Sequence, residues 1–444
     1  MPVIIVLALV ASIGWTIAQR RSPQKPAARP AAPAAAPSTP LQVVLTPLGG
    51  TEKIDQDITK LQARTKTTPN LVPALLERLG WTFVEKARIT NDPGFYKLAE
   101  QCADAIALKV PGSPDAELLR GHIYHALHRF KDAETIARKL VAERTFVFDY
   151  ALLGDALMEQ GRLNEAVDAY QTMVDLKPCL QTYSRVAHMR WLKGDLPGAI
   201  QAIRYAVSAG SILEPEPVAW AYTKLAFYEL QAGELPQARR ATELATKYVP
   251  DYAAALLLRG RVLLAEDKPA EAVATLRPAA EKNPLPEYLW TLADSLRAAG
   301  QAEQANAVEK KLLVTGAAND PRTFALFLAT RGNQPDLALR LAKAELEARQ
   351  DIFTRDAIAW AAFRKGDLKT AGDNIKVALS EGTRDGRLFY HAGLIAAAAG
   401  KIDESQTYLN EAKALEQMLL PSEQISLEQT LALLPRPNTQ VSSR

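Results

Sequence analysis

Three closely spaced histidines are the first residues of this chain whose types and spacing suggest chemistry. His122, His125 and His128 follow one another at intervals of three. On a helix the first two lie close enough to share a ligand, but a zinc site needs about four ligands. Neither a cysteine nor a pair of acidic residues completes the set nearby. The chain also lacks a glycine-rich phosphate loop and a nucleophile elbow. We therefore expect no metal ion, no other cofactor and no enzymatic activity.

The tryptophans have a more informative spacing. Four of them lie at characteristic distances before the glycine that ends their own predicted helix. Trp220 lies 13 residues before its glycine, Trp290 lies 10, Trp360 lies 6 and Trp191 lies 3. Steps of three and four residues follow a single stripe of a helix. The apolar residues that pack one unit together lie on a second stripe, more than about 100° away. We therefore expect these tryptophans, with Trp81, on a face that does not pack the repeat.

A repeat of about 34 residues positions these side chains. One small residue recurs at steps of 33 or 34, with a single step of 39: Ala99, Ala133, Ala166, Ala199, Ala238, Ala272, Ala305, Ala338, Ala371 and Ser405. Self-similarity at a fixed period is the signature of a solenoid. The long step contains five extra residues within 208–217, and we expect a kink or a break in the stacking there.

One unit, residues 150–178, shows how the repeat folds. Gly161 ends a first amphipathic helix, because glycine enters the left-handed conformation without steric cost. Ala166 is small where a second helix crosses the first, and Pro178 ends that second helix. One such hairpin cannot bury its own apolar faces, so neighbouring hairpins must stack. The sequence therefore predicts an all-α fold.

This pattern resembles the tetratricopeptide repeat (TPR) family. The resemblance is carried by Leu153, Gly154, Ala166, Tyr170 and Pro178, and again by Gly260, Leu263, Ala272, Leu276 and Pro284. It covers residues 71–418 and implies a right-handed superhelical solenoid of about ten TPR-like helix-turn-helix repeats. It also implies a non-catalytic scaffold or adaptor for protein–protein interactions.

In the resembled family the second stripe of the first helices lines a concave groove in which partners bind. The matching residues here are Trp81, His122, His125, Asp155, Met158, His188, Trp191, Trp220, Phe227, Arg261, Trp290, Asp294, Arg297, Phe353, Trp360 and Phe363. Aromatic anchors with a few charges are typical of binding surfaces. The family's carboxylate clamp uses an Asn and several basic residues, which these positions do not provide. We therefore expect an apolar or aromatic-rich protein or peptide segment as the partner. The alternative interpretation is that the tryptophans pack between first helices and stiffen the superhelix.

The ends of the chain predict further segments. An apolar run at residues 3–18 predicts a signal peptide or signal anchor within 1–21, followed by a Pro/Ala-rich linker at 22–50. Helices at 51–70 and 419–434 are expected to cap the array, and residues 435–444 to form a disordered tail. We expect export to the cell envelope, periplasmic or secreted, or anchoring by residues 3–18. That segment is the only expected contact with a membrane.

Charge and cysteine usage limit the remaining functions. The formal net charge of +3 is nearly neutral for 444 residues, and no concentrated basic face predicts nucleic-acid binding. Cys102 and Cys179 lie far apart in the sequence, and we expect no disulfide between them. Two alternatives remain open. One is a structural component of a cell-envelope assembly that uses the convex face or the ends of the array, and the other is a cryptic ligand- or metal-binding protein at His122 and His125.

Overall fold

A computed structural model describes residues 38–434 of the chain, and the residues from Thr39 onward form one compact unit. Over the described range every regular element is a helix, and no strand is present. The helices are α1 (Pro40–Val44), α2 (Lys53–Thr67), η1 (Pro69–Leu71), α3 (Val72–Thr90), α4 (Gly94–Lys109), α5 (Pro114–Ala126), α6 (Phe130–Glu143), α7 (Val147–Glu159), α8 (Leu163–Leu176), α9 (Leu180–Leu192), α10 (Leu196–Ser208), α11 (Pro215–Gln231), α12 (Leu235–Tyr248), α13 (Ala253–Ala265), α14 (Pro269–Lys282), α15 (Pro286–Ala298), α16 (Ala302–Asn319), α17 (Pro321–Arg331), α18 (Pro335–Ala348), α19 (Ile352–Lys365), α20 (Leu368–Ala378), α21 (Gly386–Ala398), α22 (Ile402–Lys413), η2 (Glu416–Met418) and α23 (Pro421–Leu433).

The predicted signal or anchor at 1–21, most of the predicted linker and the predicted tail at 435–444 lie outside the described residues. None of the helices within residues 38–434 combines the length and the apolar character needed to cross a membrane.

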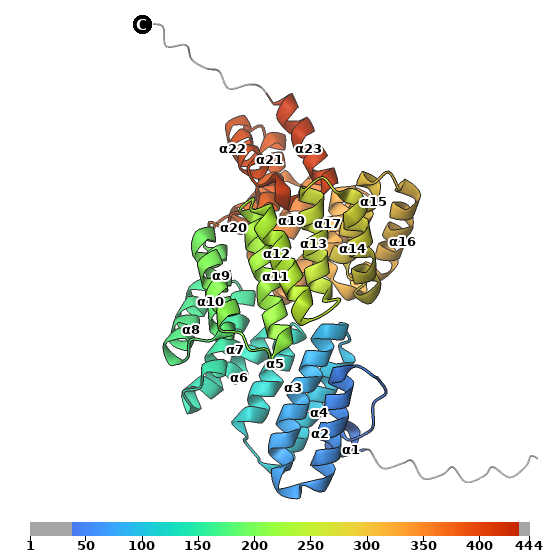
Figure 1. Cartoon of the computed structure of the whole chain (residues 1–444). Helices are drawn as coiled ribbons and strands as arrows, with labels where there is room; N and C mark the ends of the chain where they lie inside the picture. Colours follow the sequence, from blue (N-terminus) through green and yellow to red (C-terminus); the bar gives the residue numbers. More distant parts are fainter. Residues whose placement is uncertain (1–37, 435–444) are drawn as a thin grey trace, which may run out of the picture. The chain divides into compact units, whose positions relative to one another are not determined.

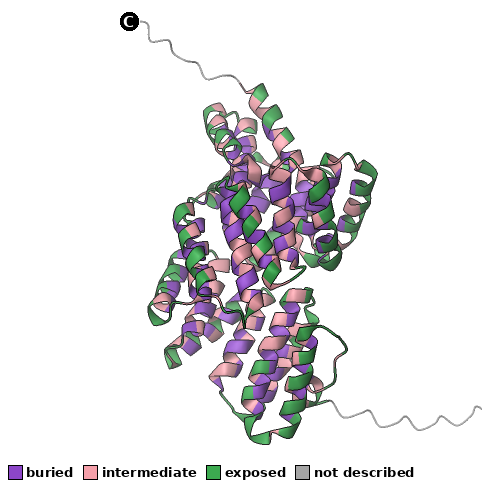
Figure 2. Cartoon of the chain, in the orientation of Figure 1, coloured by how far each residue is buried: buried purple, intermediate pink, exposed green. Residues whose placement is uncertain are grey.

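Ten helical hairpins, from α3/α4 to α21/α22, form the array and confirm the predicted fold class (Figure 1). Each of the ten recurring small residues is 0% exposed, including Ser405 in the last hairpin. Full burial explains why the position excludes larger side chains, since the two helices of a hairpin meet there. Figure 2 shows buried residues gathered in the central helices and exposed ones on the outer helices.

The turn between the two helices of a hairpin has a positive φ, as predicted at Gly161, where φ is +73°. Three hairpins place a residue with a side chain at this point. Asn91, in the first hairpin, has φ +54° and belongs to a residue type that tolerates this conformation. His128 and Asp267 each have φ +59°. A side chain in this region costs conformational energy, so these two turns are strained relative to the others.

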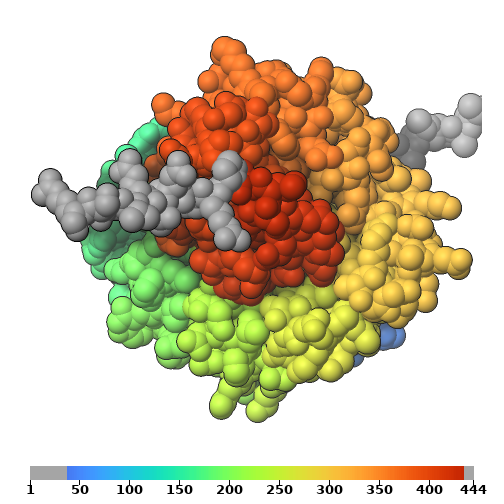
Figure 3. Space-filling model, turned by 90° about the horizontal axis from the view of Figure 1, so that it is seen from above, coloured from blue at the N-terminus to red at the C-terminus, as the bar shows by residue number. Residues whose placement is uncertain are grey.

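The superhelix closes on itself after six hairpins, α7/α8 to α17/α18. The Gln350 N–H donates to the carbonyl oxygen of Glu159 at 3.0 Å. The Thr383 hydroxyl donates to the carbonyl of Leu192, and Lys193 pairs with Glu381. We call these contacts between residues 159–194 and 349–384 the seam. Figure 3, seen from above, shows green, yellow and orange segments around the C-terminal residues, coloured red, which lie over the middle.

The structure corrects two expectations about segments. Residues 40–44 of the predicted linker form α1, and Val44 is 1% exposed because it packs into the N-terminal core. Residues 208–217 do not break the stacking, since Ala206 and Val218 belong to one continuous core. The apolar core divides instead near α5, where residues 44–123 form a separate cluster.

The two predicted capping segments are helical. α2 at the N-terminal end contacts α3, and α23 at the C-terminal end contacts α22 and α15. Both cysteines are free thiols; Cys102 is buried and Cys179 is half-buried.

Candidate functional site

Two adjoining cavities lie on the inner side of the closed turn. The first, of about 240 Å³, opens at the seam and is lined by Met158, Glu159, His188, Arg349 and Asp351, among others. The second, of about 190 Å³, is lined by residues of α11, α13, α15, α17, α19 and α21 and by the segment before α23. We call them the seam cavity and the inner cavity. Phe353 and Arg322 line both, so these two side chains form the shared wall.

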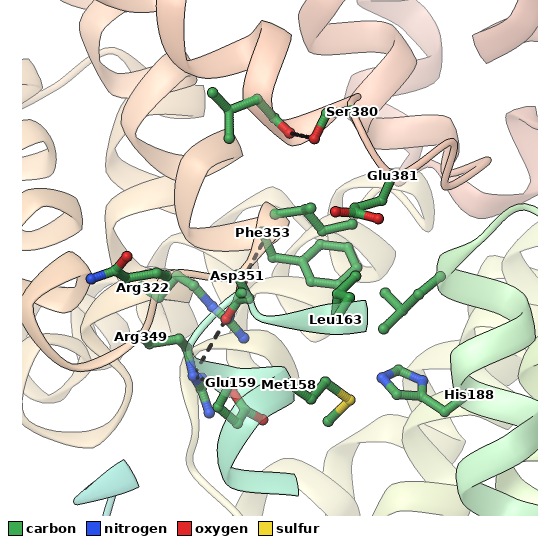
Figure 4. Close-up of a pocket in the computed structure, with 15 residues that line it drawn as sticks. Met158, Glu159, Leu163, His188, Arg322, Arg349, Asp351, Phe353, Ser380 and Glu381 are labelled. Carbon is green, nitrogen blue, oxygen red and sulfur yellow. Dashed lines mark hydrogen bonds and ion pairs between the residues drawn. The ribbon is translucent and has the colours of Figure 1, made fainter. Parts of the chain in front are cut away.

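The charged side chains of the seam cavity are paired with one another. Arg322 donates from one nitrogen to both oxygens of Asp351, at 3.2 and 3.0 Å. Burial alone would lower the pKa of Arg322, but Asp351 and Asp320 outweigh it and raise that pKa. Arg349 lies 2.7 Å from Glu159 across the seam. Figure 4 shows both arginines on one side of the cavity and His188 on the other, with Phe353 between them.

The other wall of the seam cavity is aromatic. Phe353 stacks on Trp191, with ring centroids 5.8 Å apart and an interplanar angle of 12°. The Trp191 indole N–H donates to Gln231 Oε1 at 2.6 Å. His188 stacks on the same indole at 5.5 Å. Burial, assisted by the Lys224 ammonium, lowers the pKa of His188 to about 3. The imidazole is therefore neutral at pH 7.

In the inner cavity, the positive charge of Arg261 is poorly compensated by carboxylates. Arg261 donates to the Met418 carbonyl oxygen at 2.5 Å, and the carboxylate of Glu287 is 3.5 Å away. Burial lowers the pKa of Arg261, and the nearby Arg387 lowers it further, while Glu287 opposes both. The Arg387 guanidinium lies 4.9 Å from the centroid of the Trp290 ring.

The structure brings six of the sixteen predicted groove residues together at the two cavities. Met158 and His188 line the seam cavity, Phe227, Arg261 and Trp290 line the inner cavity, and Phe353 lines both. They come from six different helices, α7, α9, α11, α13, α15 and α19. The stripe predicted from the sequence is therefore a shared inner surface over these helices.

Trp191 packs behind His188 and Phe353 of the seam cavity. The other nine predicted residues lie elsewhere, each beside its own partner. Their contacts are Trp81 with His122, His125 with Phe130, Asp155 with Arg185, Trp220 with Lys224, Asp294 with Arg331, Arg297 with Glu309, and Trp360 with Phe363. In the part of the chain that the structure describes, no group of three or more His, Cys, Asp and Glu side chains is placed to hold a metal ion.

The expectation that all five tryptophans face an open groove is wrong in one respect. Trp191, Trp290 and Trp360 are only 5%, 1% and 1% exposed. Trp360 stacks on His391 at 4.1 Å and donates to the Thr330 hydroxyl at 3.0 Å. Phe353 covers Trp191 across the seam. Trp290 and Trp360 pack instead against side chains of neighbouring first helices, as the alternative interpretation of the sequence expected. Trp81 and Trp220 remain half-buried, and binding of a partner by any of these residues stays a prediction.

Sequence reasoning missed several arginines of the site, although the same stripe contains two of them. Arg322 lies 10 residues before Gly332, and Arg387 lies 13 before Gly400. These are the offsets of Trp290 and Trp220 from their own glycines. Arg349 lies in a loop between hairpins and had no such signal, because its pairing with Glu159 exists only across the seam.

Comparison with known proteins identifies the repeat. A family model described as "Tetratricopeptide repeat" matches residues 151–212 and 223–284. No curated protein sequence matches the chain. Similar solved structures include the human IFIT1 dimer with PPP-AAAA, at 14% identity over 82% of this chain and 87% of that chain, with a TM-score of 0.46. The APC/C hetero-tetramer Cut9-Hcn1 is similar at 12% identity over 85% and 91%, with a TM-score of 0.37.

A tetratricopeptide repeat protein from Parabacteroides merdae is similar at 17% identity over 57% of this chain and 98% of that chain, with a TM-score of 0.33. At such values these structures carry no information on what this chain binds. Residues 151–212 and 223–284 therefore match tetratricopeptide repeats, and the ten hairpins of the described residues continue the same periodicity on both sides of them.

Proposed function

We propose that this protein is a non-catalytic scaffold that holds a segment of a protein partner inside its closed turn, at the seam cavity and the inner cavity. Tetratricopeptide repeats serve in general as protein-interaction scaffolds, and the family is generally non-catalytic. The observation that carries the proposal is the convergence of six inner-stripe residues from six helices on two cavities that share Phe353.

The size of the cavities favours side chains of a peptide over a whole small molecule. Sites for drug-sized ligands have volumes of about 300–1,000 Å³. The seam cavity has about 240 Å³ and the inner cavity about 190 Å³. Each volume suits one or two side chains, and an extended segment can place neighbouring side chains in both.

The chemistry of the walls favours apolar or aromatic partner side chains. In the seam cavity Arg322 and Arg349 already have carboxylate partners, so they offer little to a further charge. Met158 and Phe353 are half-buried apolar side chains at the same cavity. Covering them with a partner's apolar group contributes roughly 25 cal/mol per Å² before association costs.

Site-specific photo-crosslinking tests this proposal. A photoreactive amino acid replaces Met158 in the seam cavity or, as the control, Lys310, which is exposed on α16. The captured partner is identified by mass spectrometry and purified, and its affinity is measured for Met158→Lys and for the control Lys310→Glu. We expect capture from position 158 only, and an affinity at least tenfold weaker for Met158→Lys, with an unchanged helical circular dichroism spectrum.

Equal capture from both positions, or an unchanged affinity of Met158→Lys, would contradict the proposal. That outcome would favour the alternative in which the convex face or the ends of the array build a larger cell-envelope assembly.

We also propose, from the sequence alone, that residues 3–18 direct export or anchor the chain in a membrane. The support is the uncharged apolar run and the Pro/Ala-rich stretch that follows it. Mass spectrometry of the N-terminal peptide, after expression in a host that exports proteins, tests this. We expect a chain that is either cut after residue 18 or recovered with the membrane fraction. An uncut chain recovered without membranes would contradict the proposal.

A further inference from the structure

The segment that follows the last hairpin reaches into the inner cavity. Met418 and Leu420 line that cavity and are 4% and 2% exposed. We call residues 416–423 the C-terminal insert; they comprise η2 and the first turn of α23. In Figure 3 the C-terminal residues, coloured red, lie over the middle of the surrounding green, yellow and orange segments. The insert therefore occupies part of the surface that the proposed function assigns to a partner.

The inner surface packs against Met418 and Leu420 and also contacts the insert through polar groups. Arg261 of α13 donates to the Met418 carbonyl oxygen at 2.5 Å. The side-chain amide of Gln417 donates to the main-chain carbonyl oxygen of Gln231, at the end of α11, at 2.7 Å. Every residue type has a main-chain carbonyl group. A segment of a different sequence can therefore also accept the hydrogen bond from Arg261.

A buried carboxylate fixes the helix that begins within the insert. Arg387 of α21 donates to both oxygens of Glu423, at 2.8 and 3.1 Å. One of these oxygens also accepts from the Leu420 N–H at 2.8 Å. The Glu423 side chain is 0% exposed. A buried carboxylate requires such pairing, so an acidic residue three positions after Leu420 is part of what this surface recognises.

The fit of the insert is incomplete. A volume of about 190 Å³ remains beside Met418 and Leu420. The outer side of α23 is uncovered, with Ile425 59% and Leu433 85% exposed. A segment with larger side chains at the two apolar positions would fill more of the inner cavity than the insert does.

We propose that the C-terminal insert is an internal ligand, and that the protein partner carries a segment of the same chemistry which displaces it. This inference rests on the proposed function. The partner segment has two large apolar residues two positions apart, followed three residues later by an acidic residue at the start of a helix. The insert lowers the apparent affinity for that partner, because it must leave the inner cavity before the partner enters.

The test uses the full chain and a synthetic fluorescein-labelled peptide of residues 411–434. In the chain, Met418→Asp with Leu420→Asp releases the insert and leaves the inner surface unaltered. We expect the released chain to bind the peptide at least tenfold more tightly than the unaltered chain. A matched peptide with Glu423→Gln should bind at least tenfold more weakly than the original, because Arg387 loses its charge partner.

Amide hydrogen exchange supplies a readout that does not depend on the released variant. In the unaltered chain, a saturating excess of the isotopically labelled peptide should accelerate exchange in the chain's own α23 and leave α11 and α13 protected. Equal affinities of the two chains for the peptide, no binding to either, or unchanged exchange in α23 would overturn the inference. Photo-crosslinking at position 158 tests the proposed function separately. Displacement of the insert, together with a cellular partner captured only from position 310, overturns the proposed function and leaves the insert as an internal ligand of the inner cavity.

Discussion

The contact between Gly154 and Tyr170 sets the distance between the two helices of one hairpin. A Cβ atom added to Gly154 would lie 2.3 Å from a ring carbon of Tyr170. The ring cannot easily move, because Tyr170 is 3% exposed and its hydroxyl donates to Asp155 at 2.7 Å. The glycine is therefore required by packing.

We predict that Gly154→Ala destabilises the protein by about 1–3 kcal/mol, as overpacking of a core does, measured by urea unfolding. The control is Gly372→Ala in α20, where an added Cβ meets nothing within 4 Å. Removing a helix-interior glycine there should stabilise by about 0.5–1 kcal/mol. Gly154→Ala that is as stable as the parent would contradict the packing argument.

The ion pair between Asp155 and Arg185 links two neighbouring hairpins, with distances of 2.8 and 2.5 Å. Burial alone would raise the pKa of Asp155, but the charge and the hydrogen bonds of Arg185 outweigh it and lower the pKa to about 2. The unfolded value is about 3.9. The ionised carboxylate therefore stabilises the fold above about pH 4, and this contribution is lost as the pH falls from about 4 to 2.

Asp155→Asn should lose about 2 kcal/mol of stability at pH 7. The difference between parent and variant should shrink as the pH falls through the window from about 4 to 2, measured as urea midpoints at each pH. A difference that stays constant down to pH 2 would show that the pair does not titrate as described.

At the scale of elements, the hairpin turns follow the sequence most directly. Most turns have glycine at the position with positive φ, whereas α13/α14 has the exposed Asp267 there, with φ +59°. The equivalent Gly300 of α15/α16 has φ +76°, and an added Cβ meets nothing within 4 Å. These two turns differ in backbone preference and not in packing.

We predict that Asp267→Gly stabilises the protein by about 0.5–1 kcal/mol and that Gly300→Ala destabilises it by about 1–2 kcal/mol. Thermal unfolding of the two single variants against the parent measures both effects. Changes of the same sign in the two variants would rule out strain at these turns as the cause.

The period of the small residues was sufficient to predict ten hairpins, because each unit repeats one local packing problem. α1 was missed because its burial depends on α4 and on hydrogen bonds from Gln62 to the carbonyls of Val44 and Thr46. The expected break at 208–217 was wrong because the extra residues lengthen both the loop at 209–214 and α11, and the core that contains Ala206 and Val218 stays continuous. The local sequence pattern predicts the helices, but it does not show against which residues an inserted or a terminal segment packs.

At the scale of the whole unit from Thr39 onward, the closure of the turn could not be predicted from the sequence. It depends on small rotations between successive hairpins that add up over six of them. Lys193 and Glu381 look like ordinary surface charges in the sequence, yet they pair across 188 positions. The stripe of inner residues was predictable from its spacing, whereas the stacking of Phe353 on Trp191 follows from the closure.

The most direct test of the closed turn is a zero-length carbodiimide crosslink on the unaltered protein. The reagent joins an amine to a carboxylate only when the two groups are in contact, so it should link Lys193 to Glu381 within one molecule. Lys369 and Asp373, 2.8 Å apart within α20, are the internal control. The account predicts both crosslinked peptides in the monomer. Recovery of the control crosslink alone, or of the Lys193–Glu381 crosslink only between two molecules, would contradict it.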